Sequence, residues 1–113
     1  SSSKFLIMGR VSTGMNGNHS YIALNCGGSL VHIADSAETR LRTTSTHSAK
    51  ATWDMADQVF TYLWAPNTTN AITIKIQGAF ESSALYINRS ERDGNYIYDS
   101  RATSEMTIFE LRS

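Results

Sequence analysis

The sequence contains few cysteines and prolines, which are residues that constrain a fold through covalent chemistry. Its 113 residues include one cysteine, Cys26, and one proline, Pro66. A single cysteine cannot form an internal disulfide, and Cys26 is too isolated from other ligand residues for a zinc site. Cys26 is therefore expected to be a small buried apolar residue, and packing alone must stabilise the fold.

The chain also lacks an excess of charge and a long apolar run. Ten lysines and arginines balance ten aspartates and glutamates, so no long-range field attracts nucleic acid or an anionic membrane. No apolar run approaches the roughly 20 residues that span a bilayer. The first residues, 1–4, do not have the layout of a signal peptide. We therefore expect no nucleic-acid partner and no insertion into a membrane.

The length suits one domain, residues 1–113, with one hydrophobic core. Residues 5–8 are typical of a core strand and begin almost at the start of the chain. A free-standing protein usually has some lead-in before its first core strand. We therefore expect this domain to be the C-terminal end of a longer polypeptide.

Alternation of apolar and polar residues is the main structural signal. In residues 71–77, Ile72, Ile74 and Ile76 share one face, and polar residues occupy the other face. Short segments of this kind, separated by Gly, Asn, Asp and Ser, predict an all-β antiparallel sandwich of about eight strands. The expected strands include residues 4–11, 20–24, 30–34, 58–64, 71–77, 84–88 and 106–111.

Several local features refine this prediction. The continuous apolar run of 4–11 is typical of a strand in the middle of a sheet. Gly27 and Gly28 supply the positive φ that a tight hairpin between 20–24 and 30–34 requires. Residues 45–57 fit a helix after a serine cap about as well as a strand or loop. Residues 89–104 are too polar and rich in turn residues to form core.

No catalytic or metal-binding pattern stands out. His19, His32 and His47 lie on separate segments with no second ligand at metal spacing. No serine lies in a Gly-x-Ser-x-Gly setting, although a triad assembled from distant segments stays open. We expect a protein that is not an enzyme, with no metal and no cofactor.

Two pairs of carboxylates are the remaining candidates for chemistry. Asp54 with Asp57, and Glu91 with Asp93, could serve a glycosidase as acid and base. Solvated turn residues explain the same pairs. Asp93-Gly94-Asn95 matches part of a calcium loop but lacks the downstream glutamate, which favours a turn.

The loop 89–104 carries the residue types of a binding surface. Tyr96 and Tyr98 alternate with polar residues, and tyrosine offers flat amphipathic area for carbohydrate or protein. Packing of both tyrosines against the sandwich edge is the alternative. The predicted binding residues are Arg92, Asp93, Asn95, Tyr96 and Tyr98.

The second half of the chain resembles domains of bacteriophage virions. The resemblance rests on Leu63-Trp64-Ala65-Pro66, residues 71–77, Leu85-Tyr86-Ile87-Asn88-Arg89-Ser90 with Asp93, then Arg101 and residues 104–111; residues 2–7 resemble the first strand of that family. Such domains occur in tail fibres and other appendages, especially of marine and cyanobacterial phages. Trp64 and Glu105 depart from the pattern of the family.

This resemblance implies a jelly roll similar in outline to the tumour-necrosis-factor and complement-head domains. It implies a homotrimeric fibre head on the virion that attaches to a glycan or protein of the host surface. A capsid decoration domain that binds other virion proteins, a free-standing lectin and a glycan hydrolase are the alternatives.

Two of the predicted strands are apolar on both faces, as expected for strands at a subunit interface. Residues 59–64 and 106–111 each carry apolar side chains on both faces, which a monomeric sandwich has little use for. The predicted interface residues are Val59, Phe60, Tyr62, Trp64, Met106 and Ile108.

Overall fold

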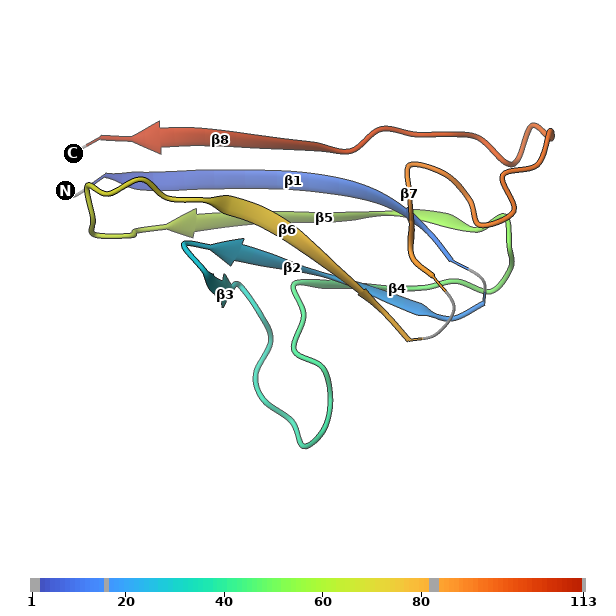
Figure 1. Ribbon diagram of the computed structural model, residues 1–113, viewed down its shortest axis with the longest axis horizontal. Helices are drawn as coiled ribbons and strands as arrows, with labels where there is room; N and C mark the ends of the chain where they lie inside the picture. Colours follow the sequence, from blue (N-terminus) through green and yellow to red (C-terminus); the bar gives the residue numbers. More distant parts are fainter. Residues whose placement is uncertain (1–2, 16, 82–83, 113) are drawn as a thin grey trace.

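The computed structural model describes residues 3–15, 17–81 and 84–112, which form two facing antiparallel sheets (Figure 1). This part of the chain contains eight strands and no helix, and hence no helix that could span a membrane. The predicted antiparallel β-sandwich of about eight strands is confirmed. The strands are β1 (Lys4–Gly14), β2 (His19–Cys26), β3 (Ser29–Val31), β4 (Ser45–Ser48), β5 (Met55–Trp64), β6 (Ile74–Phe80), β7 (Tyr86–Ile87) and β8 (Glu105–Leu111).

Strand β1 lies at the centre of the first sheet, as its apolar run predicts. β5 follows one edge of β1 from end to end, with Phe5 opposite Trp64 and Gly14 opposite Met55. The other edge of β1 is shared, because β8 pairs with its first half and β7 with Thr13 and Gly14. Strand β8 is exposed along its whole length.

Strand β2 takes the same central place in the second sheet. β6 pairs along one edge, and β3 and β4 pair in succession along the other. The turn between β2 and β3 contains Gly27 and Gly28 with φ of 63° and 92°. The predicted glycine hairpin is therefore confirmed.

The segment 45–57, for which the sequence allows a helix or a strand, is a strand, a turn and the start of another strand. After β4, the carboxylate of Asp54 accepts hydrogen bonds from the N–H groups of Lys50 (2.8 Å) and Ala51 (3.0 Å). This side-chain bonding gives the backbone a turn in place of a helix.

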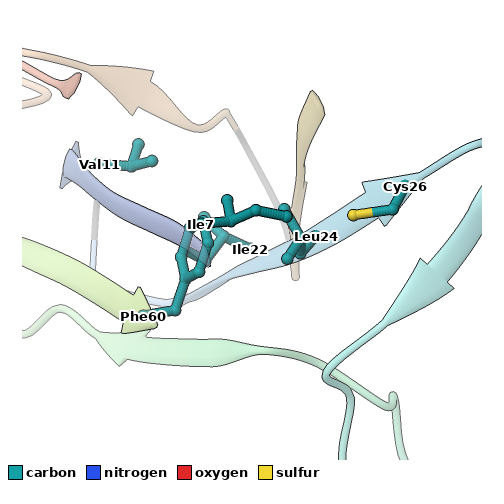
Figure 2. Close-up of a cluster of buried hydrophobic side chains, with 6 residues drawn as sticks. All are labelled: Ile7, Val11, Ile22, Leu24, Cys26 and Phe60. Atoms are coloured by element: carbon teal, nitrogen blue, oxygen red, sulfur yellow. The ribbon is translucent and has the colours of Figure 1, made fainter. Parts of the chain in front are cut away.

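The hydrophobic core lies between the two sheets. Its centre is formed by Ile7, Val11, Ile22, Leu24, Cys26 and Phe60 (Figure 2). Ile74 and Ile76 pack against these side chains as predicted, whereas Ile72 precedes β6 and lies outside the cluster. Cys26 is buried, and burial raises the pKa of its thiol, so it acts as a core residue.

Candidate functional site

The loop 88–104 between β7 and β8 folds onto the end of the sandwich farthest from the chain ends (Figure 1). The N–H of Asn88 donates to the carbonyl of Ser12 (2.9 Å), and the N–H of Ser12 donates to Ser104 Oγ (3.1 Å). Gly14 permits this approach, because a Cβ at its position would overlap the backbone of Arg89 and Ser90. Both ends of the loop are thus fixed to β1.

A buried carboxylate holds the middle of the loop. Asp99 accepts hydrogen bonds from Ser90 Oγ (3.0 Å) and from Nε (3.0 Å) and Nη2 (2.8 Å) of Arg92. Ser90 and Asp99 are both buried, so this polar loop contributes two residues to the interior. Hydrogen bonds to an ionised carboxylate are among the stronger ones, and they fix Arg92 in one position.

Three aromatic rings surround the fixed guanidinium group. Arg92 Cζ lies 4.9 Å from the ring centroid of Tyr96, 5.1 Å from that of Tyr98 and 5.1 Å from that of Trp53. Tyr96 and Tyr98 stack with a centroid distance of 5.3 Å, and Trp53 meets Tyr98 edge-on at 6.3 Å. We call these four residues the aromatic cluster. Its rings are about half exposed, at 47% for Trp53, 57% for Tyr96 and 55% for Tyr98.

The structure brings three of the five predicted binding residues, Arg92, Tyr96 and Tyr98, into this cluster. Asp93 instead pairs with Arg101, whose Nη2 and Nε donate to its carboxylate at 2.7 and 3.1 Å. These bonds lower the pKa of Asp93 and raise that of Arg101. Asn95 is exposed in the same loop.

Sequence reasoning missed Trp53. It lies in the turn between β4 and β5, and the N–H of Arg92 donates to the carbonyl of Thr52 (3.0 Å) to join this turn to the loop 88–104. A tryptophan among polar residues, in a segment without clear periodicity, was the one available signal. It gives no indication of which distant loop it meets.

The predicted interface residues separate into two groups. Phe60, Tyr62 and Trp64 point inward, where Phe60 is 7% exposed and the other two pack against the core. The core uses these side chains, and their part in a subunit interface stays a prediction. Val59 on the outer face, and Met106 and Ile108 on β8, are exposed.

The outer face of the first sheet carries an apolar row that sequence analysis did not identify. Leu6 of β1 lies in register between Leu63 of β5 and Phe109 of β8. Leu63 and Phe109 are both half exposed. Leu111 and Val59 extend the exposed apolar surface toward the two ends of this face.

The histidines lie apart and take separate roles. His19 Nδ1 lies 2.6 Å from Glu81 Oε2, and this hydrogen bond lowers the pKa of Glu81. His32 stacks on Tyr62 with 5.0 Å between ring centroids. His47 Nδ1 lies 3.3 Å from Thr13 Oγ1, and burial lowers its pKa.

Three of the four carboxylates proposed for a glycosidase have structural partners. Asp54 bonds the turn described above, Asp57 lies 3.5 Å from Arg10, and Asp93 is paired with Arg101. Across residues 3–15, 17–81 and 84–112, no group of three His, Cys, Asp or Glu could hold a metal ion.

Comparisons with protein-family models, with curated proteins and with solved structures found no match to this chain. A fixed loop and the adjoining turn together expose three aromatic rings. They offer amphipathic area at little further cost in entropy, which suits recognition of another molecule.

Proposed function

We propose that this chain is a virion structural domain, the head of a bacteriophage tail fibre or related appendage, that attaches the particle to a glycan or protein of the host surface. The aromatic cluster is the observation that carries the proposal. Exposed tyrosine and tryptophan side chains are enriched where proteins bind partners, and Asp99 already holds the central arginine.

The sequence resemblance supports a phage appendage, and the position of the site supports attachment. The aromatic cluster lies on loops at one end of the sandwich, and both described chain ends lie at the other (Figure 1). A domain joined to a shaft through either end would direct these loops away from it.

Replacing both Tyr96 and Tyr98 with alanine tests the proposal. If both rings contact the receptor, the double variant should lose on the order of 2 kcal/mol or more of binding free energy. Adsorption of variant particles to host cells is measured beside the melting temperature of the variant domain. Undiminished adsorption by a folded variant would contradict the proposal.

A homotrimer is part of the same proposal. The apolar row of Leu6, Leu63 and Phe109 offers a surface that association would cover, together with the exposed Val59 on the same face. Sedimentation should therefore give a trimer at micromolar concentration. The variant Phe109→Ser should shift the distribution toward monomer, and a wild-type monomer would contradict this part.

The same apolar face favours one alternative, a capsid decoration domain that binds neighbouring virion proteins. In that case the outer face of the first sheet would contact the capsid and the aromatic cluster would be dispensable. Electron microscopy of the parent particle separates these functions by position. A free-standing lectin would show the same glycan binding in a protein expressed by a cell.

A further inference from the structure

The loop 88–104, which contributes Arg92, Tyr96 and Tyr98 to the aromatic cluster, has equal numbers of positive and negative side chains. Residues 88–104 contain three arginines and three carboxylates. Arg92 is bonded to Asp99, and Arg101 is bonded to Asp93. Arg89 Nη1 lies 3.8 Å from Asp93, and its guanidinium also lies 4.6 Å from the ring centroid of Tyr86. All three arginines of the loop are thus already engaged by groups of their own chain.

Arg92, the cation nearest the rings, is the least free to change partners. Two of its donors are directed at Oδ2 of Asp99, whose side chain has no exposed surface. Turning Arg92 toward an external anion would leave a buried carboxylate without its counterion, which is strongly unfavourable. Its role is to position the rings, and the buried Ser90 supports it through the same carboxylate.

The surface left for a ligand is therefore aromatic and uncharged. It consists of the exposed parts of Trp53, Tyr96 and Tyr98, with the exposed Asn95 beside them. Aromatic faces match the C–H faces of sugar rings, while phenol hydroxyls and amides form directional hydrogen bonds with sugar hydroxyls. Protein receptors, unlike uncharged glycans, commonly place charged groups opposite free charges of the binding surface. The surface at the aromatic cluster offers few free cations.

We infer that the aromatic cluster binds an uncharged glycan, in preference to an acidic polysaccharide or a protein. The inference rests on the proposed function, in which this loop is the attachment site. It predicts binding that depends on the rings and is nearly independent of ionic strength, because screening weakens only charge-dependent binding.

The test uses the purified chain and affinity electrophoresis through gels that contain one polysaccharide each. Dextran, laminarin and galactomannan are the uncharged probes, and alginate and chondroitin sulfate are the acidic ones. At least one uncharged polysaccharide should retard the chain, with affinity that changes less than about twofold between 50 and 500 mM NaCl.

Variants separate the rings from the charges. Tyr96→Ala should weaken retardation at least about tenfold, as expected for a contact anchor. Trp53→Ala should do the same. Arg101→Gln, which removes the most exposed cation of the loop, should stay within about threefold of wild type. Melting temperatures of all three variants establish that each is folded.

Two results would overturn the inference. One is retardation by none of the uncharged polysaccharides. The other is tighter, salt-sensitive binding to alginate or chondroitin sulfate that Arg101→Gln abolishes. In either case, loss of host adsorption by the Tyr96→Ala, Tyr98→Ala particle would leave the attachment function standing with a different receptor. Normal adsorption by that particle would remove the attachment function as well.

Discussion

The two long loops of this domain differ in how they are held. The loop 88–104 is bonded to β1 at both ends and to the turn at Thr52, and it buries Ser90 and Asp99. The loop 32–44, between β3 and β4, extends away from the sandwich (Figure 1). Thr44, at its end, donates its N–H to the carbonyl of Ile22 in β2 (2.9 Å). Bonds farther out join its own arms, as when the N–H of Ala34 donates to the carbonyl of Thr43 (3.2 Å).

This difference shows that buried polar anchors, more than composition or length, determine whether a loop is fixed. Both loops are polar and lie outside the strands. Only in 88–104 does a carboxylate enter the interior and gather donors from Ser90 and Arg92. Once its donors are in place, such a group resists local opening, because an opened loop must separate an ion pair.

Limited trypsin digestion should show the largest difference. Cleavage needs local opening, so bonds after Arg40 and Arg42 should be cut at least about tenfold faster than bonds after Arg89, Arg92 and Arg101. Mass spectrometry of the first fragments provides the measurement. First cuts within 88–104 would reverse the comparison.

Removing the buried charge should make the two loops more alike. Asp99→Asn keeps the size of the side chain but leaves Arg92 without its counterion, so we expect a loss of about 2 kcal/mol in the free energy of unfolding. Trypsin should also cut faster after Arg92. Urea denaturation measures the first effect. The matched control, Asp35→Asn in the exposed loop 32–44, should change stability by less than about 0.5 kcal/mol.

Lowering the pH should destabilise the loop 88–104, because Asp93 becomes protonated and its pair with Arg101 is lost. Hydrogen bonds from Arg101 lower the pKa of Asp93 below its ordinary value of 3.8. As the pH falls, Asp93 is therefore protonated in the unfolded chain before it is protonated in the folded one. Its contribution is therefore complete above pH 3.8 and is lost as pH falls through the lowered pKa. Urea denaturation from pH 7 to pH 2 should give a shallower profile for Asp93→Asn than for wild type. Identical profiles would show that the pair adds nothing.

The smallest effect is expected at Leu41 in the other loop. Leu41 is 60% exposed, so Leu41→Ser should change the free energy of unfolding by no more than about 0.5 kcal/mol. Thermal melting is sufficient to measure it. A larger loss would mean that Leu41 and the loop 32–44 are firmly held against the second sheet.

The sequence predicts the strands better than it predicts their inward faces. Period-two alternation predicted the core face of β6 at Ile74 and Ile76, because the polar residues leave one possible core face. The predicted strand 71–77 began too early, since β6 covers Ile74–Phe80. In β5 both faces are apolar, so the pattern could not tell that Phe60 is buried and Val59 exposed. That choice depends on the partner sheet, which local sequence does not specify.

The candidate site was predicted in part for a similar reason. Tyr96 and Tyr98 were identified because alternating tyrosines mark an amphipathic loop segment. Trp53 and the burial of Asp99 could not be predicted, since both depend on a contact between segments far apart in the chain. Polarity also argued against burial of Ser90, although a satisfied hydroxyl can be buried at little cost.

The pairing of the first strand with the last has a practical consequence. Lys4 lies opposite Leu111 in the register of β1 and β8, so the two ends of the described chain are neighbours. A short peptide joining these ends, with new termini opened in the loop 32–44, would give a circular permutant that keeps every strand pairing. Such a permutant could be tethered through the second sheet, leaving both the outer apolar row and the aromatic cluster accessible on one molecule.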